Sequence, residues 1–433
     1  MSTERYVSTR DALRMSEGSE VRLRGWVYRW RDLGKRVFIV LRDSAGIIQV
    51  VAKRGFTPEN YISVAREADV ESSIVVEGVI HRDPRAPGGA EVWARRLEIV
   101  GPSRDFPIKG GESIEYLLDK RHLWIRSRRL TTLMKLRHKL FQSYREYFNG
   151  KGYYEVSPPM LTQAAVEGGA TLFKVDFFGK PAYLTQSAQF YLEALIFSLE
   201  KVWTLAPSFR AERSRTRRHL YEYWHLEVEA AWSRMRDMMN LAEELISHTV
   251  NSLLNNALEE LALIGRRTEE LEPARKPGYP IIEYEEAIRI LQRKGVNIRY
   301  GDDLGADEER ILTQEYETPF FIIYYPAELK SFYMKPRPER PDQVLAFDML
   351  APNVGEIIGG SEREDNYEAL KKRIIERGYN VEEYEWYLDL RKYGSVPHSG
   401  FGLGVERQLM WLAGLDHIRD AIPFPRFRDR IYP

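Results

Sequence analysis

The chain has 433 residues, well above the roughly 100 to 200 of a typical single domain, so we expect at least two domains. Its 64 basic residues balance 64 acidic ones, which excludes a global positive field and leaves any RNA binding to local basic clusters. The absence of cysteine and of any apolar run of roughly 18 residues excludes disulfides, thiolate metal sites and a membrane-spanning helix. The N-terminus has no secretion-signal pattern, so we expect a cytoplasmic protein.

The first hundred residues show the pattern of a small β-barrel. Segments 21–27, 37–42 and 47–51 are strand-like, and the last two flank a tight turn at 43–46. Two further strand-like segments, 71–80 and 90–100, are separated by a loop that contains proline and glycine. Five strands in about 100 residues predict an OB-fold over residues 1–101.

A linker or hinge is expected over residues 102–128, because two prolines and two glycines interrupt the pattern between 102 and 111. Residues 129–433 then form a second domain. Its apolar periodicity predicts helices at 131–148, 236–263, 365–378 and 403–413. Strand-like segments lie between them at 182–185, 202–209, 225–229, 320–325, 345–349 and 356–358. Long helices interleaved with short strands predict an α+β domain with a mostly antiparallel sheet flanked by helices.

The segment Phe209-Arg210-Ala211-Glu212 directly follows a predicted strand. A basic loop continues to Arg218-His219-Leu220, where the chain turns back into another strand. An arginine that reaches into a cleft can grip a phosphate with two hydrogen bonds and stays charged at any working pH. A strand, a basic loop and a returning strand therefore form a cradle suited to adenine and phosphates.

Glycine occupies every second position from Gly400 to Gly404, and Arg407 follows in the first turn of the next predicted helix. Alternate glycines remove the side chains from one face of a strand, so that a flat group can approach the backbone. The spacing differs from dinucleotide-binding and P-loop fingerprints.

Asp348 and Glu356 are eight residues apart with a predicted turn between them. This spacing places two carboxylates on neighbouring antiparallel strands, facing the same way. Hard oxygen ligands of this kind are what Mg²⁺ requires beside a triphosphate.

Together these segments resemble the three sequence motifs of the class II aminoacyl-tRNA synthetases. Residues 152–158 resemble motif 1, which builds a dimer interface; residues 209–229 resemble motif 2, and residues 402–407 resemble motif 3. With the N-terminal barrel, the chain is similar over nearly its full length to the subgroup that charges aspartate, asparagine or lysine. The resemblance implies a homodimeric ligase that activates an amino acid with ATP and Mg²⁺ and transfers it to tRNA.

The resemblance also implies roles for individual residues. Arg210 and Arg407 would be catalytic and would clamp the α- and γ-phosphates. The full set of ATP contacts would be Arg210, Glu212, Arg218, His219, Leu220, Glu356, Gly404 and Arg407. Asp348 and Glu356 would bind Mg²⁺. In the barrel, which would serve as the anticodon-binding domain, the central anticodon base would be read by Arg31, Phe38 and Gln49. Because catalysis in this family depends on positioning and electrostatic stabilisation, no general base is expected.

The choice of amino acid depends on the segment Gln186-Ser187-Ala188-Gln189-Phe190-Tyr191-Leu192-Glu193. Aspartyl enzymes carry a pattern that resembles Gln-Ser-Pro-Gln-x-x-Lys-Gln, in which the lysine neutralises the substrate carboxylate. Leu192 stands at that lysine position, and loss of such a pairing costs about 3–5 kcal/mol. A neutral carboxamide suffers no such loss.

Two charged residues favour asparagine in the same way. Glu227 would accept a hydrogen bond from the amide NH₂ group and repel a substrate carboxylate, while Arg363 would donate to the amide oxygen. The remaining contacts with the amino acid would be made by Glu167, Gln189, Arg210 and Gly359.

Three alternatives stay open on the sequence alone. The first is an aspartyl enzyme that also charges the asparagine tRNA. The second is a synthetase-derived asparagine synthetase, which would have no need of the anticodon barrel. The third is a non-catalytic RNA-binding relative, which Arg210, Glu356 and Arg407 oppose.

Overall fold

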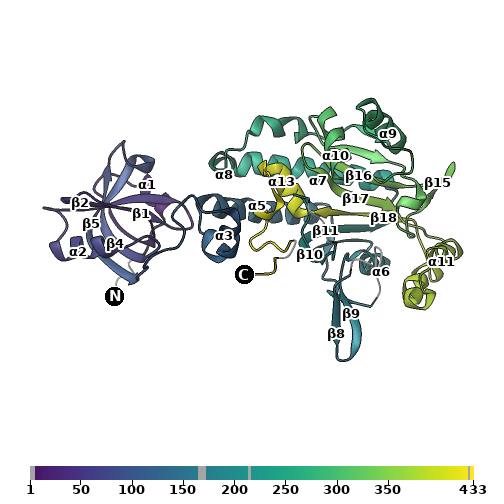
Figure 1. Ribbon diagram of the computed structural model, residues 1–433, viewed down its shortest axis with the longest axis horizontal. Helices are drawn as coiled ribbons and strands as arrows, with labels where there is room; N and C mark the ends of the chain where they lie inside the picture. The colour runs from purple at the N-terminus through teal and green to yellow at the C-terminus, as the bar shows by residue number, and fades with distance from the viewer. Residues whose placement is uncertain (1–4, 164–171, 213–215, 428–429) are drawn as a thin grey trace. The chain divides into compact units, whose positions relative to one another are not determined.

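The computed structural model describes residues 5–163, 172–212, 216–427 and 430–433 (Figure 1). The chain forms two compact units, Met1–Leu117 and Leu118–Pro433, which we call the barrel unit and the larger unit. Among the described residues, no helix has the length and apolar character of a membrane span. Glu167 and the basic positions 213 and 215 lie outside the described residues.

The barrel unit is a closed barrel of five strands in the order β1-β2-β3-β5-β4, as the sequence predicts. The strands are β1 (Glu20–Asp32), β2 (Arg36–Arg42), β3 (Ile47–Lys53), β4 (Ser73–Arg82) and β5 (Ala90–Gly101). Alternate residues such as Val37, Ile39 and Leu41 are buried in its interior, so their neighbours face outward. Two short helices, α1 (Thr9–Arg14) and α2 (Glu59–Glu67), pack against it.

The larger unit is built on an eight-stranded sheet in the order β12-β13-β16-β17-β18-β11-β10-β6. All neighbouring strands are antiparallel except the two outermost pairs, which confirms the predicted mostly antiparallel sheet. The strands are β6 (Tyr154–Glu155), β10 (Lys201–Phe209), β11 (Glu222–Ala231), β12 (Ile281–Glu283), β13 (Phe320–Ile323), β16 (Ala346–Ala351), β17 (Gly355–Glu362) and β18 (His398–Gly404). Smaller sheets join β7 (Leu161–Thr162), β9 (Lys180–Leu184) and β8 (Lys174–Phe177), and join β14 (Pro336–Arg337) and β15 (Arg340–Val344).

Long helices cover one face of the large sheet. They are α5 (Arg128–Gly150), α7 (Met235–Asn256) and α13 (Val405–Ala413), and Figure 1 shows them grouped on one side of the strands. Ser127 caps α5 by accepting a hydrogen bond from the backbone N–H of Leu130. The apolar stripe that begins at Leu133 and Leu136 then packs into the main core of this unit.

The opposite face of the sheet carries the functional cavity. Along β11, Leu226 and Val228 point into the core beneath α13, so Glu227 and Glu229 point the other way. Helix α6 (Gln189–Leu199) packs against β10 and β11, and its first turn lines the cavity on this second face.

Several elements differ from the sequence expectation. The segment 236–263 is two helices, because Ala257 leaves the helical conformation between α7 and α8 (Leu258–Leu263). The expected linker contains α3 (Ile114–Asp119) and α4 (Arg121–Trp124). The expected helix at 365–378 is α11 (Tyr367–Glu376). Further helices that the sequence analysis did not predict are α1, α2, α6, α9 (Tyr284–Arg293), α10 (Ala306–Leu312) and α12 (Glu385–Lys392).

Candidate functional site

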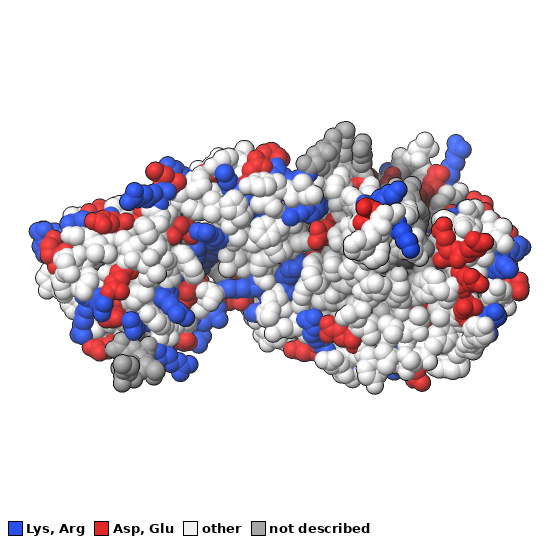
Figure 2. Space-filling view, turned by 90° about the horizontal axis from the view of Figure 1, so that it is seen from below, with Lys and Arg blue, Asp and Glu red and all other residues white. Residues whose placement is uncertain are grey.

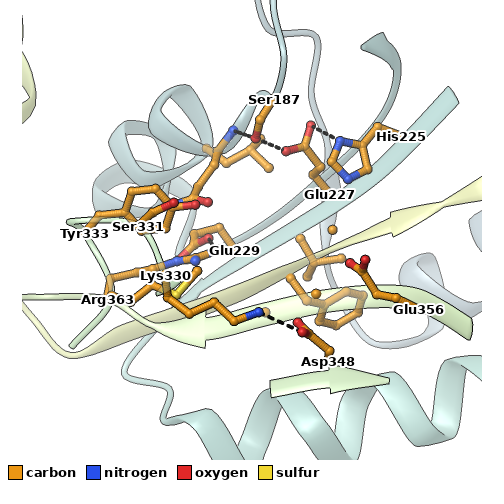
Figure 3. A pocket seen from close by; sticks show the side chains of 18 of the residues that line it. Ser187, His225, Glu227, Glu229, Lys330, Ser331, Tyr333, Asp348, Glu356 and Arg363 are labelled. Atoms are coloured by element: carbon orange, nitrogen blue, oxygen red, sulfur yellow. Dashed lines mark hydrogen bonds and ion pairs between the residues drawn. The ribbon is translucent and has the colours of Figure 1, made fainter. Parts of the chain in front are cut away.

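A cavity of about 350 Å³ opens on the second face of the sheet, between α6 and strands β11, β16, β17 and β18 (Figure 3). Two smaller cavities adjoin it at the other end of these strands, of about 280 and about 60 Å³. Arg210 and Glu356 line all three, so they stand where the cavities meet. The arrangement provides one continuous site with two chemically different ends.

Arg210 directly follows β10 and is fixed where β10 and β11 diverge. Its backbone N–H donates to the carbonyl of Tyr221 at 2.9 Å, and its guanidinium lies 5.5 Å from the ring centre of Tyr223. This places a permanently charged group over the sheet, facing the cavities. The structure therefore puts the motif 2 arginine in a position to contact phosphate oxygens.

The alternate glycines of β18 leave room mainly for other side chains of the protein. A Cβ atom at Gly400 would collide with Glu229, and one at Gly402 would collide with His225. Gly404 meets only ordinary contacts with Arg407 and lines the cavity of about 60 Å³. The expectation of a bare face for a flat ligand therefore holds for the last glycine, whereas the first two make room for residues of β11.

Asp348 and Glu356 lie on neighbouring antiparallel strands and their side chains converge. A Cβ atom at Gly359 would be 3.1 Å from Oε1 of Glu356 and 3.3 Å from Oδ1 of Asp348, so the two oxygens approach the same point. Lys330 donates to Oδ2 of Asp348 at 2.7 Å, as Figure 3 shows, and Arg407 donates to Oε2 of Glu356 at 3.0 Å. Two cations of the protein thus balance the two carboxylates.

The electrostatics of this pair fit a divalent cation. Burial, together with the neighbouring charge of Glu356, raises the pKa of Asp348 to about 6 in spite of Lys330. Burial would also raise the pKa of Glu356, but Arg407, Lys330 and other cations hold it at about 2. A further positive charge between the two carboxylates would favour the ionised form of both. Convergent hard carboxylate oxygens of this kind suit Mg²⁺.

Arg218 is held by a residue that the sequence analysis did not identify. Its guanidinium makes a two-pronged ion pair with Glu309 from α10, and Nη1 also donates to the carbonyl of Val354 at 3.2 Å. Oε2 of Glu309 accepts a further hydrogen bond from the backbone N–H of Glu356 at 2.6 Å. Glu309 therefore links the motif 2 loop to the strand that carries a predicted metal ligand.

The other predicted nucleotide contacts lie around the cavity of about 60 Å³. His219, Leu220 and Gly404 all line it. Burial, with the charges of Arg407, Arg218 and Arg210, lowers the pKa of His219 to about 4, so this ring is neutral near pH 7. Glu212 is half-buried and directly precedes residues 213–215, and its predicted contact with the nucleotide stays a prediction.

The opposite end of the site gathers the residues predicted to contact the amino acid. Gln189, Leu192, Glu227, Gly359 and Arg363 all line the cavity of about 350 Å³. The side chain of Leu192 is fully buried in its wall, at 0% exposure. Figure 3 shows Glu227 and Arg363 on opposite sides of the space.

Both charged residues of this pocket are anchored. Glu227 accepts from the hydroxyl of Ser187 and from the backbone N–H of Ala188 at 2.8 Å. Arg363 makes two hydrogen bonds to Glu229, at 3.1 and 2.9 Å, and its Nη1 donates to the hydroxyl of Ser361 at 2.7 Å. Their positions are therefore set by the protein before any ligand enters.

The cavity lining also contains residues that the sequence analysis missed. They are Ser187, His225, Glu229, Asp303, Lys330, Ser331 and Tyr333. Of these residues, Lys330 was the easiest to identify from the sequence, because a lysine in a largely apolar segment between strands requires a counter-ion.

In the barrel unit, Arg31, Phe38 and Gln49 share the outer face. Arg31 pairs with Phe38 across β1 and β2, and Gln49 pairs with Val40 across β2 and β3. Nε2 of Gln49 donates to Glu91 at 2.6 Å, and Phe38 is half-buried with interior-facing neighbours on either side. The structure thus brings the three predicted residues together on one surface.

Comparisons with known proteins agree with these observations. Residues 113–428 match the family described as tRNA synthetases class II (D, K and N), and residues 21–100 match the OB-fold nucleic acid binding domain. The asparagine–tRNA ligase of Thermococcus kodakarensis is 56% identical over 420 residues, which cover 96% of this chain and 97% of that protein.

Two solved structures resemble the whole chain. One is the asparaginyl-tRNA synthetase of Pyrococcus horikoshii complexed with asparaginyl-adenylate, with a TM-score of 0.96 and 52% identity, covering 99% of this chain and 100% of that one. The other is the Entamoeba histolytica asparaginyl-tRNA synthetase in complex with asparaginyl-adenylate, with a TM-score of 0.89 and 33% identity over 100% of both chains.

Proposed function

The chain belongs to the class II tRNA synthetases of the D, K and N group, and we propose that it activates L-asparagine with ATP and transfers it to the asparagine tRNA. The observation that carries the choice of amino acid is Leu192, which is fully buried in the wall of the larger cavity. An aspartate carboxylate would face a leucine at the position where the aspartyl pattern has a cation. A buried carboxylate without its pairing cation binds about 3–5 kcal/mol more weakly, which corresponds to a preference for asparagine of more than a hundredfold.

The two ends of the site correspond to the two substrates. Asparagine would lie in the cavity beneath α6, with its amide between Glu227 and Arg363. Its α-ammonium group would be bound by Gln189, with Glu167 as a further proposed contact outside the described residues. Arg210 stands where the cavities meet, so it can hold the α-carboxylate and the α-phosphate in the same place.

Adenylate formation needs positioning and charge stabilisation. The asparagine carboxylate attacks the α-phosphorus of ATP, a new P–O bond forms, and pyrophosphate leaves with the electrons of the broken bond. Arg210 would stabilise the charge that develops on the α-phosphate, and Arg407 would hold the γ-phosphate. His219, Leu220 and Gly404, with Glu212 and Arg218, would hold the remainder of the nucleotide. A terminal hydroxyl of the tRNA then attacks the asparaginyl carbonyl, and AMP leaves.

Mg²⁺ is part of the proposal, with Asp348 and Glu356 as its ligands. When bound, the ion would neutralise phosphate charge and orient the leaving pyrophosphate. Lys330 is ion-paired with Asp348 and Arg407 with Glu356, so both carboxylates have a cation of the protein beside them without the metal.

The barrel unit would bind the anticodon. Phe38 offers a ring on the outer face for a base to stack on, Gln49 offers hydrogen bonds to a base edge, and Arg31 adds positive charge beside them. A cytoplasmic location, where ribosomes use charged tRNA, is part of the same proposal.

A homodimer is the proposed assembly. The motif 1 segment exposes Tyr154, and Leu161 is exposed shortly after it; exposed apolar side chains grouped in one region are typical of interaction surfaces. Figure 2 shows a face on which charged side chains are sparse over the middle of the larger unit. Sedimentation equilibrium is expected to give a dimer, and Tyr154→Asp is expected to shift the protein toward monomer. A monomeric wild type would contradict the assembly.

Aminoacylation tests the overall function. With ATP, Mg²⁺ and labelled asparagine, the enzyme is expected to charge an asparagine tRNA transcript and to leave an aspartate tRNA transcript uncharged. Charging with aspartate at a comparable rate would instead support the aspartyl alternative. Formation of aspartyl-adenylate, without transfer of an amino acid to either tRNA, would support the asparagine synthetase alternative.

A further inference from the structure

Glu193 is a buried carboxylate behind the amino-acid pocket, and it lies outside the residues assigned above. It is fully buried in α6, one position after Leu192. Its two oxygens accept from the hydroxyl of Tyr387 at 2.9 and 2.8 Å and from a guanidinium nitrogen of Arg391, and Nε2 of His398 lies 3.0 Å from Oε2. Hydrogen bonds and a positive charge from this many partners stabilise the ionised form of the Glu193 carboxylate.

This carboxylate is connected to two residues that line the pocket. Oε1 of Glu193 accepts from Nε2 of Gln189 at 2.9 Å, which turns the amide oxygen of Gln189 away from Glu193. A carboxylate oxygen of Glu193 also lies within 4.8 Å of one of Glu229, which is ion-paired with Arg363. Burial lowers the pKa of Arg363, but the charges of Glu229 and Glu193 outweigh that effect and raise it. Arg363 and Glu229 are both visible at the pocket wall in Figure 3. Glu193 therefore influences both ends of the amino acid without lining the cavity.

The charges of this buried group are balanced. Two carboxylates, Glu193 and Glu229, are paired with two guanidinium groups, Arg391 and Arg363. A divalent cation could be held by Glu193, Glu229 and His398 on distance alone, but the two arginines already supply the positive charge. Removal of the Glu193 charge would leave two guanidinium groups against one carboxylate, and a net positive charge beside the pocket.

An aspartate substrate would need a net positive charge beside its carboxylate, and the described residues of this protein do not provide one. The aspartyl pattern has Lys-Gln at the two positions that are Leu192 and Glu193 here, so this chain differs by two units of charge in a single turn of α6. Leu192 removes a cation, and Glu193 adds an anion. Both differences act against a carboxylate in the pocket and have little effect on a neutral carboxamide.

We propose that Glu193 is a positioning and specificity-determining residue that rejects aspartate from behind the pocket, by cancelling positive charge that would otherwise reach the substrate side chain. The proposal rests on the proposed function, because it concerns discrimination in favour of asparagine. The effect is electrostatic and acts through Arg363, while the hydrogen bond to Gln189 orients the contact with the α-ammonium group.

The test is pyrophosphate exchange with asparagine and with aspartate, measured for wild type and Glu193→Gln. The substitution keeps the shape and removes the charge. A unit charge roughly 12 Å away at an effective dielectric constant of about 20 changes affinity by roughly tenfold. The ratio of kcat/KM for aspartate to that for asparagine is therefore expected to rise about tenfold, chiefly through KM for aspartate.

A matched control restores the charge balance. The double variant Glu193→Gln, Arg391→Met removes one charge of each sign, so its aspartate-to-asparagine ratio is expected to return to the wild-type value. If both substrates instead lose efficiency by the same factor in the single variant, with the ratio unchanged, Glu193 only supports the fold and the proposal is wrong.

A second pair of variants tests the proposal if Glu193→Gln does not fold on its own. Leu192→Lys is compared with Leu192→Lys, Glu193→Gln, which carries the lysine and glutamine of the aspartyl pattern. The double variant is expected to exceed Leu192→Lys about tenfold in the same ratio, and equal ratios would overturn the proposal. Failure of the proposed function itself would appear separately, as a wild type that prefers aspartate.

Discussion

Glu309→Gln tests the link between α10 and the nucleotide end of the site. Glu309 and Arg218 are each less than a tenth exposed and form a two-pronged ion pair. Glutamine keeps the size of the side chain and can still accept one hydrogen bond, but it leaves the charge of Arg218 unbalanced. Breaking a buried pair in this way costs about 3–5 kcal/mol. Because Val354 still accepts from Arg218, we expect about 3 kcal/mol.

The expected loss of unfolding free energy is measurable by differential scanning calorimetry of the full chain, in the transition of the larger unit. For a unit that spans Leu118–Pro433, an unfolding entropy of about 2.1 cal/mol/K per residue gives roughly 1.5 °C per kcal/mol, so the transition should fall by about 4–5 °C. Glu315→Gln is a matched control, because its ion pair with Lys294 is more than a third exposed, and we expect a change within about 0.5 kcal/mol.

Addition of ATP should then stabilise the Glu309→Gln variant and the wild type to different extents. Arg218 lines the cavities in which the phosphates are proposed to lie, so phosphate oxygens can replace the lost carboxylate. ATP is therefore expected to raise the transition temperature of Glu309→Gln more than that of the wild type. An equal increase for both proteins would refute the reasoning that Arg218 faces the phosphates, and an unchanged transition without ATP would refute the cost assigned to the pair.

Three further predictions concern other parts of the chain. Arg407→Ala should abolish asparagine-dependent pyrophosphate exchange and leave tRNA binding nearly intact; surviving exchange would exclude the phosphate-clamp role. Phe38→Ala should weaken tRNA binding at fixed salt by roughly 1–3 kcal/mol, as for loss of one stacked base, without changing pyrophosphate exchange. Burial and nearby cations lower the pKa of His417 from 6.5 to about 4, so the unfolded chain binds the extra proton and stability falls as pH drops from about 6.5 to 4. Because His417 is only half-buried, we expect about 1 kcal/mol of this loss at pH 5, and His417→Asn should lack it in denaturant unfolding at pH 7.5 and 5.

The fold could be predicted from the sequence where periodicity is strong. The five barrel strands alternate cleanly, and α5 repeats apolar residues at helical spacing, so both were predicted close to their observed bounds. Helix α6 is different, because it is apolar on most sides and buried between β10 and other elements, which leaves no periodic pattern to mark it. Helix α9 was not predicted, although its amphipathic stripe, with Ala287, Ile288 and Leu291 buried, is a local pattern that needs no tertiary information.

The candidate site divides in the same way. Residues in local motifs, such as Arg210 and Arg407, were identified because the motif and the site coincide along the chain. Glu309 could not be found in this way, since it meets Arg218 from 91 positions away. The same holds for Glu193, whose partners Arg391 and His398 come from α12 and β18. Contacts of this kind depend on how elements pack, which no local pattern encodes.

Pyrophosphate exchange with asparagine and with aspartate, on the unmodified enzyme with ATP and Mg²⁺, tests the central claim most directly. A buried Leu192 in place of a cation predicts that kcat/KM for asparagine exceeds that for aspartate by more than a hundredfold. Equal values, or a higher value for aspartate, would contradict the assignment of asparagine as the substrate.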